Sequence, residues 1–436
     1  MKKMLKRFAW LILLCLLVSC PALADEAADP VDFAGRVTLN LHSETVKQEV
    51  TVKTYVDGDT THFLVSESVM EGGVLKARYL AVNTPETTGK IEEYGKKAAQ
   101  FTREKLSNAT SIIIESDTGA WNKDSTGDRY LVWIWYKQEG MEEYRNLNIE
   151  ILQNGLANPN AAKQNRYGDT CMAAVTYARE QKLNIFSGQR DPDFYYGDAV
   201  ELTLRELRCN PETYEGIKVA FNGVITMNSN NSVFLEAYDA ETDRYYGISV
   251  YYGHNMSGTG LEILSVGNEA RIVGTVQYYE AGGTWQVSGL TYRGMKPKDP
   301  SNIQKISEGH LPAYVLTDPD SFANMEIIQE VNGEDKAFSY AELAMATSIE
   351  MKNLTVTDAY TTTDEDSSSH GAITLSCMAD GIPVKVRTGV LYDENRALIT
   401  QDLLLNKTID VKGIVDYYEG EYQIKVFSWN AITIHP

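Results

Sequence analysis

The sequence has few cysteines, few histidines and a deficit of positive charge. Its 436 residues include five cysteines and six histidines, and 60 acidic side chains stand against 40 basic ones, a formal net charge of −20. No CxxC pair occurs and the histidines are scattered, so no zinc-ligand spacing is present. These absences argue against a histidine-based zinc site and against a Cys-His nucleophile.

Cysteine is also too sparse for a disulfide framework. After the amino-terminal Cys15 and Cys20, only Cys171, Cys209 and Cys377 remain, and they are widely spaced. At most one pair can form among these three. We expect them to be buried as small apolar side chains.

The shortage of basic residues bears on partners. Long-range capture of nucleic acid normally relies on positive potential, and this chain is strongly acidic. A tight nonspecific DNA binder is therefore disfavoured, and any nucleic-acid site would need a local inversion of charge. The acidity itself is typical of a soluble, exposed surface.

No apolar run is long enough to span a membrane. Residues 8–18 form an apolar run that follows four basic residues, which is typical of a signal peptide, so we expect an exported protein with residues 1–24 as its signal. The segment ending at Cys20 resembles a bacterial lipobox, in which Cys20 would carry lipid and tether the protein to the membrane. Ala22 and Ala24 offer a competing cleavage site.

The length of the chain and the positions of its proline and glycine breaks indicate three domains. Proline breaks near residue 191, and proline with glycine at 293–300, separate the apolar-periodic regions. We predict a first domain at 43–190, a second at 195–293, a linker at 294–312 and a third at 313–436. Alternation and spacing in the first domain predict strands at 48–55, 62–66, 77–82, 111–115 and 131–135 and helices at 92–106, 146–154 and 170–182.

The second and third domains contain a divergent repeat. Residues 274–280 (GTVQYYE) match 413–419 (GIVDYYE), and 202–207 parallel 338–343 at nearly the same distance upstream. Two similar barrels explain this economically, so the predicted fold is mainly β (α+β): an OB-like barrel with helices followed by two smaller OB-like barrels. Four tyrosines at 245, 246, 251 and 252 could form a stacking platform or fill a core, and tyrosine-rich strands favour the core.

Three charged motifs point to chemistry on phosphate. They are Val56–Thr60 (VDGDT), Arg78–Glu86 (RYLAVNTPE) and Asp128–Leu131 (DRYL). Hard cations take oxygen ligands, a scissile phosphate needs its charge neutralised, and an attacking water needs a base. The order of the motifs therefore suits metal-assisted phosphodiester hydrolysis.

Together with 93–102, 154–157 and 182–187, these motifs resemble the thermonuclease, or staphylococcal nuclease-like, family over residues 43–190. The resemblance implies an OB-like barrel with helices and a Ca²⁺-dependent endonuclease acting on DNA or RNA. It also implies that Asp59 binds Ca²⁺, that Thr84 binds it through its carbonyl oxygen, and that Asp57 lies beside the metal. Asn83 stands where the family has a second metal-binding aspartate.

The catalytic side chains follow from the same resemblance. Glu86 would be the base that activates water, and Arg78 and Arg129 would grip the phosphate, because guanidinium forks match phosphate oxygens. An amide at Asn83 keeps an oxygen ligand but loses a charge. A unit charge at 4 Å is worth about 4 kcal/mol at an effective dielectric of 20, so calcium affinity would fall by at most roughly three decades.

Two further departures concern substrate. The approach to Arg129 through residues 124–128 is one residue longer than in the family, and the family's substrate-stacking tyrosines have no counterparts in 158–162. Tyr167 is the nearest replacement. Base recognition by the first domain is therefore in question.

Two other functions stay open on the sequence alone. A noncatalytic surface protein with a decayed metal site could use the barrels to bind nucleic acid, glycan or protein. An envelope-organising scaffold would bind no nucleic acid at all. Metal-dependent cleavage distinguishes the nuclease from the noncatalytic binding protein. A nucleic-acid binding assay distinguishes the scaffold, which would bind none, from both.

Overall fold

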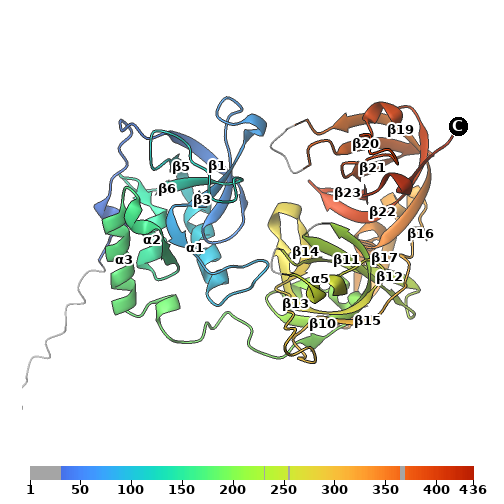
Figure 1. Cartoon of the computed structure of the whole chain (residues 1–436), viewed down its shortest axis with the longest axis horizontal. Coiled ribbons are helices and arrows are strands. Elements are labelled where there is room, and N and C mark those ends of the chain that lie inside the picture. The colour runs from blue at the N-terminus through green and yellow to red at the C-terminus, as the bar shows by residue number, and fades with distance from the viewer. Residues whose placement is uncertain (1–30, 230, 254–255, 364–368) are drawn as a thin grey trace, which may run out of the picture. The chain divides into compact units, whose positions relative to one another are not determined.

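The computed structural model describes residues 31–229, 231–253, 256–363 and 369–436. The proposed signal peptide and Cys20 lie outside these residues. The chain forms three closed barrels of five strands each, with few helices (Figure 1). The predicted fold class of one helix-decorated barrel followed by two further barrels is confirmed.

The first barrel uses five strands in the spatial order β3-β2-β1-β5-β6, closed by pairing of β3 with β6. The strands are β1 (Lys47–Tyr55), β2 (Thr60–Leu64), β3 (Val74–Tyr79), β5 (Ala109–Glu115) and β6 (Tyr130–Gln138). The helices are α1 (Gly95–Ser107), α2 (Leu147–Gln153) and α3 (Gly168–Glu180). The predicted strands and helices occur where expected, with ends shifted by a few residues, except that the strand predicted at 77–82 is divided into β3 and β4 (Ala81–Asn83) by the positive φ of 67° at Ala81.

The second barrel has β10 (Lys218–Ser229), β11 (Ser232–Asp239), β12 (Arg244–Tyr251), β13 (Glu269–Tyr279) and β14 (Thr284–Ser288). A short helix, α5 (Thr259–Ile263), connects β12 to β13. The edge strands β9 (Val200–Glu201) and β15 (Gln304–Ser307) extend the sheet. Part of the segment expected to be a linker is therefore a strand, because β15 pairs with β13.

The third barrel has β19 (Ser348–Thr361), β20 (Ile373–Ala379), β21 (Ile382–Thr388), β22 (Thr408–Tyr418) and β23 (Glu421–Val426). It is preceded by β16 (Val315–Leu316), α6 (Pro319–Asn324), the hairpin of β17 (Glu326–Val331) and β18 (Glu334–Ser339), and α7 (Tyr340–Leu343), and it ends with β24 (Ile432–Ile434).

All three barrels share one connectivity. The first three strands form an antiparallel meander, the fourth pairs antiparallel with the first, and the fifth lies between the fourth and third, parallel to the third. This is the strand order of a Greek-key OB-type barrel. The repeated segments 274–280 and 413–419 fall on the fourth strands, β13 and β22, and the upstream segments 202–207 and 338–343 lead into the short helices α4 (Leu204–Cys209) and α7.

The glycine that opens each repeat has a steric reason. A Cβ at Gly274 would lie 2.6 Å from the Ser288 carbonyl oxygen, and one at Gly413 would lie 2.6 Å from the Lys425 carbonyl oxygen. In both barrels the fifth strand thus crosses the fourth so closely that no side chain fits. The glycine shared by the two repeats therefore lies at the close approach of the fourth and fifth strands, which are antiparallel neighbours in each sheet.

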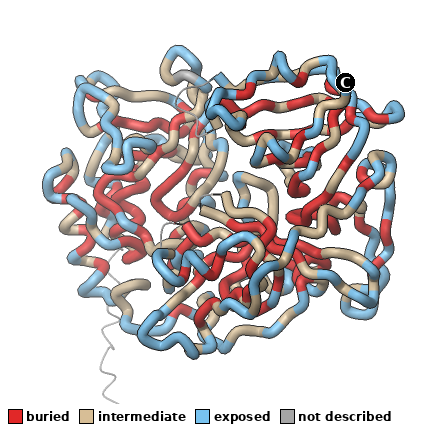
Figure 2. The backbone as a smooth tube through the Cα atoms, turned by 45° about the vertical axis from the view of Figure 1, so that its right-hand side comes forward, coloured by how far each residue is buried: buried red, intermediate tan, exposed pale blue. Residues whose placement is uncertain are grey.

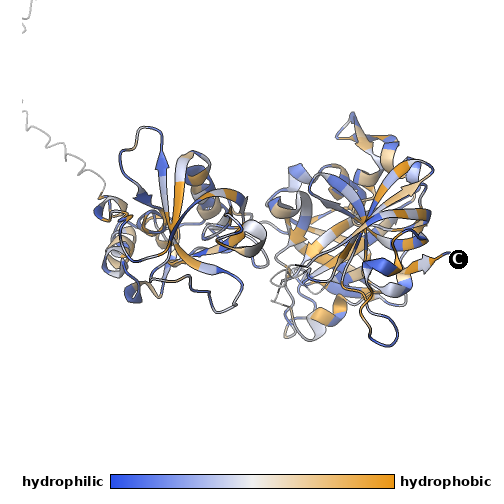
Figure 3. Cartoon of the chain, turned by 90° about the horizontal axis from the view of Figure 1, so that it is seen from above, coloured by the Kyte–Doolittle hydropathy of each residue, from blue (hydrophilic) through white to orange (hydrophobic). Residues whose placement is uncertain are grey.

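The cores lie inside the barrels, where buried positions alternate with exposed ones along the strands (Figures 2 and 3). Cys171, Cys209 and Cys377 are buried thiols without a disulfide, as expected. Burial raises the pKa of Cys171 and of Cys377 to about 12, so both stay protonated. Among the described residues, no helix is long and apolar enough to cross a membrane.

Candidate active site

The first motif forms the tight turn that joins β1 to β2. The backbone amides of Val56 and Asp57 donate to the Thr60 carbonyl oxygen, and the Asp57 carboxylate accepts from the Asp59 amide at 3.0 Å. Asp57 and Asp59 are both buried. The turn therefore fixes two acidic side chains at the end of a strand pair.

Helix α1 holds this turn against the rest of the site. The Thr102 hydroxyl donates to the Gly58 carbonyl oxygen at 2.6 Å. A Cβ at Gly58 would lie 2.8 Å from Cγ2 of Thr84 and 2.9 Å from Cβ of Ala98. Glycine is required at this position because the turn, α1 and the Thr84 segment meet there.

The second motif runs along β3 and turns sharply after it. Ala81 has a positive φ of 67°, which lets the chain enter the short strand β4 (Ala81–Asn83). The Thr84 amide then donates to Oδ2 of Asp59 at 2.8 Å, and the Tyr79 amide donates to the Asp59 carbonyl oxygen at 2.9 Å. These bonds draw the two motifs together.

Arg78 lies between two oxygen-bearing side chains. Its guanidinium forms an ion pair with Asp59 and donates to Oδ1 of Asn83 at 2.7 Å. Burial lowers the pKa of Arg78, while the Asp57 carboxylate raises it. A side chain that is nearly always cationic remains so here, and it neutralises the buried carboxylates.

The same oxygen donors suit a hard cation. Oxygens of Asp59 and Asn83 converge on one positively charged group, the Arg78 guanidinium, and the chain at Thr84 is bonded to the same carboxylate. Carboxylate, amide and carbonyl oxygens are ligands that Ca²⁺ takes. In the described part of the chain, no three His, Cys, Asp or Glu side chains are grouped to hold a metal, which agrees with an amide standing at Asn83.

Glu86 follows directly and is held by its backbone. The Glu86 amide donates to Oε2 of Glu92 at 3.2 Å, and its carbonyl oxygen accepts from the Glu92 amide at 3.0 Å. Burial raises the pKa of Glu86 and the Asp57 carboxylate raises it further, whereas Arg78 and Arg129 lower it. The carboxylate thus lies in the electrostatic field of the other charged residues of the site.

Arg129 is positioned by a neighbour that the sequence did not single out. Its Nε and one terminal nitrogen contact Oδ2 of Asp124 at 2.8 and 2.7 Å. Asp124 in turn accepts from the Thr126 amide and hydroxyl. Burial opposes ionisation of Asp124, but the hydrogen bonds from Thr126 and Arg129 hold its pKa below the usual range.

The structure therefore gathers the predicted site residues at one end of the first barrel. Arg78 and Leu131 are register partners on the parallel strands β3 and β6, Arg129 directly precedes β6, and burial together with the charge of Arg129 lowers the pKa of Arg78. Burial raises the pKa of Asp57, and Arg78 and Arg129 both oppose that rise. Asp57 and Glu86 thus share a field with both arginines.

Part of the chain is similar in sequence to known proteins. Residues 76–188 match the family described as Staphylococcal nuclease homologue. The chain is 30% identical to the thermonuclease of Staphylococcus intermedius over 139 residues, 31% of this chain and 74% of the relative. It is also 30% identical to the thermonuclease of Staphylococcus hyicus over 149 residues, 33% of this chain and 79% of that relative.

The chain belongs to the staphylococcal nuclease family. The resemblance stated from the sequence motifs is therefore confirmed. The matched family segment lies in the first barrel and its helices, and each thermonuclease match spans about a third of the chain.

In the first barrel, residues 158–162 contain no aromatic side chain that could stack on a base. Residues Asn158–Asn160 form the short strand β8, which pairs with β4. Tyr167, the nearest replacement, packs edge-on against Trp133 and Trp135, and its hydroxyl donates to Glu115 at 3.3 Å. Tyr167 is thus a packing residue.

The four tyrosines of the second barrel also separate. Tyr246 and Tyr252 are buried in the core, as the structural interpretation favoured, and Tyr245 packs against Tyr238 at a ring distance of 5.3 Å. Tyr251 is half-buried on the outer face. The four therefore form no common platform.

Proposed function

We propose that this protein is a Ca²⁺-dependent nuclease that hydrolyses phosphodiester bonds of DNA or RNA. The observation that carries the proposal is the double contact of Arg78, whose guanidinium reaches both Asp59 and Asn83, while Thr84 is bonded to the same Asp59. Family membership makes a phosphodiester the expected substrate class.

The metal would be held by Asp59, the amide oxygen of Asn83 and the Thr84 carbonyl oxygen. When bound, Ca²⁺ would supply positive charge against the scissile phosphate. One ligand carboxylate fewer weakens such a site without removing it, and calcium sites with dissociation constants of about 0.1 to 1 mM function outside cells.

The chain's own residues supply the rest of the chemistry. Glu86 accepts a proton from the attacking water, and Arg78 and Arg129 donate hydrogen bonds to the phosphoryl oxygens as negative charge grows there. Because Arg78 already binds two protein oxygens, it must exchange part of that contact for phosphate. Asp124 keeps Arg129 oriented during the exchange.

One observation favours a second function, a noncatalytic binding protein. With Arg78 bridging Asp59 and Asn83, the guanidinium and the carboxylate that the reaction would use are already paired with each other. If that bridge persists in the presence of calcium and substrate, the barrels would bind ligand without cleaving it. Metal-dependent turnover distinguishes the two functions.

The amino-terminal pattern supports an exported protein. We propose that residues 1–24 direct export and that Cys20 carries a lipid anchor, with cleavage after Ala24 as the secreted alternative. Mass analysis of the purified amino terminus separates a diacylated Cys20 from a free Asp25.

The test of activity is cleavage of single-stranded DNA and of RNA by the purified protein, with millimolar Ca²⁺ or with chelator. We expect calcium-dependent cutting that falls by about 10²–10⁴-fold in Glu86→Gln and is also lost in Arg129→Ala. Absence of cutting, even after Asn83→Asp, would reject the nuclease in favour of the binding protein.

A further inference from the structure

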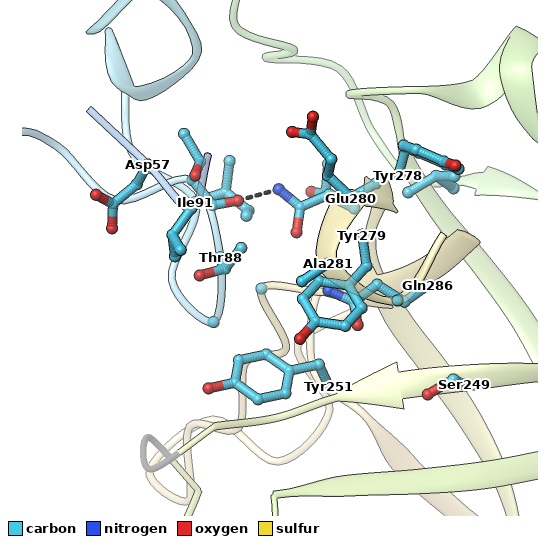
Figure 4. Close-up of a pocket in the computed structure, with 18 of the residues that line it drawn as sticks. Asp57, Thr88, Ile91, Ser249, Tyr251, Tyr278, Tyr279, Glu280, Ala281 and Gln286 are labelled. Atoms are coloured by element: carbon cyan, nitrogen blue, oxygen red, sulfur yellow. Dashed lines mark hydrogen bonds between the residues drawn. The ribbon is translucent and has the colours of Figure 1, made fainter. Parts of the chain in front are cut away.

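The outer face of the second barrel carries two tyrosines from strands that are distant in sequence. Alternation along β12 buries Ile248 and Val250 and turns Ser249 and Tyr251 outward. Figure 4 shows the rings of Tyr251 and Tyr279 projecting to the same side of the barrel. We call Ser249, Tyr251, Tyr279 and Gln286 the tyrosine face.

The strand register places these four residues on three neighbouring strands. Ser249 of β12 pairs with Gln286 of β14, and Tyr279 ends β13, the antiparallel neighbour of β14. Tyr279 is 45% exposed. The Ser249 hydroxyl and the Gln286 amide are therefore neighbours, with Tyr279 toward one end of β14 and Tyr251 toward the other, on the same side of the barrel.

Glycines allow the rings of Tyr251 and Tyr279 to pack closely against backbone. A Cβ at Gly282 would lie 2.6 Å from the ring of Tyr279, and one at Gly253, where φ is +59°, would lie 3.3 Å from the ring of Tyr251. Each ring thus lies against bare backbone of the turn that follows its strand. A ring held in place loses little conformational freedom when it binds a ligand.

The chemistry of the face indicates an uncharged, planar ligand. Its four side chains carry no charge, and Glu280, which follows Tyr279 in sequence, is ion-paired with Arg103 of α1. Aromatic rings beside an amide and a hydroxyl suit a nucleobase, which stacks on its face and forms hydrogen bonds at its edge.

The proposed phosphodiester site of the first barrel favours a nucleobase over other planar ligands. The first barrel has the charged site proposed to bind a phosphodiester. Its Tyr167 packs against Trp133 and Trp135 and is therefore not available to stack on a base. A base-binding face tethered on the same chain would raise the local concentration of substrate without any long-range positive charge. This argument rests on the proposed nuclease function.

We propose that the tyrosine face of the second barrel binds unpaired bases of single-stranded nucleic acid. Tyr251 and Tyr279 stack on bases, and Gln286 and Ser249 form hydrogen bonds with base edges. Because the tyrosine face itself has no cationic side chain, its contribution to binding depends only weakly on salt, unlike the contribution of Arg78 and Arg129 in the first barrel.

The test measures anisotropy of a labelled oligothymidylate of about 15 nucleotides, a length suited to one OB-type barrel, in chelator to prevent cleavage. We expect Tyr251→Leu and Tyr279→Leu each to weaken binding by about 5- to 100-fold, and the corresponding Phe variants to retain it. Circular dichroism confirms that each variant folds. The ratio of the wild-type affinity to the Tyr251→Leu affinity should change less than about threefold between 50 and 200 mM salt.

The third barrel provides a matched control. Tyr418 occupies the repeat position of Tyr279 and is 54% exposed, but the space around the following Gly420 is open, so the ring has no such packing against backbone. Tyr418→Leu should leave binding unchanged. Equal binding by all Leu variants, or a steep salt dependence of the ratio of wild-type to Tyr251→Leu affinity, would overturn the proposal.

Two further measurements separate this proposal from the nuclease itself. Calcium-dependent hydrolysis of a nitrophenyl ester of thymidine phosphate needs no second base, so the Tyr251 and Tyr279 variants should retain it. If the ester is cleaved but the wild type does not bind oligothymidylate, the tyrosine face is refuted and the nuclease stands. Oligothymidylate binding that depends on these tyrosines, without ester cleavage, refutes only the nuclease. Binding of cellohexaose in place of oligothymidylate would identify a glycan face and overturn the proposal.

Discussion

The same position of the barrel carries different chemistry in each copy. The last outward-facing residue of the third strand is Arg78 in the first barrel, Tyr251 in the second and Arg387 in the third. Arg78 contacts Asp59 and Asn83, whereas Arg387 donates to the hydroxyls of Thr362 and Thr374. An arginine at this position is therefore not a phosphate site by itself.

Arg78 and Arg387 differ in the side chains and backbone groups that neighbouring segments place around them. In the first barrel the turn at Asp57–Asp59 and the bend at Ala81 aim carboxylate, amide and backbone groups at the end of the third strand. The strand order is the same in all three barrels, so it supplies a frame and not a function.

The largest expected effect sharpens this comparison of the two arginines. Arg78→Ala should lower kcat/KM for single-stranded DNA by about 10²–10³-fold, because a donor to the developing phosphate charge is lost. Arg387→Ala serves as the control and should change activity less than twofold. Similar losses in both variants would mean that the arginines act through stability, which thermal unfolding would reveal.

The next prediction restores a charge in the first barrel. Asn83→Asp should tighten Ca²⁺ binding, by at most roughly 10³-fold from the charge–charge energy at an effective dielectric of 20. The new carboxylate also gives Arg78 a second anionic partner. Isothermal titration with Ca²⁺ measures the gain, and an unchanged affinity would show that residue 83 does not face the metal.

Sequence order predicted more of the first barrel than of the others. Charged residues in three short motifs located Asp59, Arg78 and Glu86, because such motifs need no knowledge of packing. Asp124 was missed because an aspartate in a Ser-Thr-Gly segment is equally typical of a turn, and only the fold shows its bond to Arg129.

The tyrosines show a second reason for what sequence could not supply. Adjacent residues of a strand point to opposite faces, so Tyr245 and Tyr246 could not share a platform. The ring that accompanies Tyr251 is Tyr279, which comes from β13 and reaches the face only through barrel closure. The spacing of tyrosines along the sequence does not indicate that Tyr251 and Tyr279 lie on the same face.

A third prediction tests what the second and third barrels have in common. Gly274→Ala and Gly413→Ala should each lower the free energy of unfolding by about 1–3 kcal/mol, because a methyl group would meet the crossing strand. Gly389→Ala is the control, since a Cβ there has open space around it. Denaturant unfolding measures all three, and equal stabilities would contradict the crossing contact.

The smallest expected effect concerns another outward-facing residue of the second barrel, Glu236. Glu236 is 2% exposed, whereas Tyr279 is 45% exposed, and Glu236 accepts hydrogen bonds from the amides of Ala313 and Ser348 at 2.7 Å and from the Ser348 hydroxyl at 2.9 Å. Burial raises the pKa of Glu236, although these three bonds oppose the rise.

A pKa that is higher in the folded than in the unfolded chain means that the folded state binds the proton more tightly. Stability from this group is therefore present below the unfolded pKa and is lost as pH rises through the folded pKa, with a slope of at most about 1.4 kcal/mol per pH unit. Glu236→Gln cannot titrate, so the difference in unfolding free energy between wild type and variant should shrink as pH rises. Denaturant unfolding between pH 4 and 8 checks this, and a difference that grows with pH would show that the bonds from Ala313 and Ser348 outweigh burial.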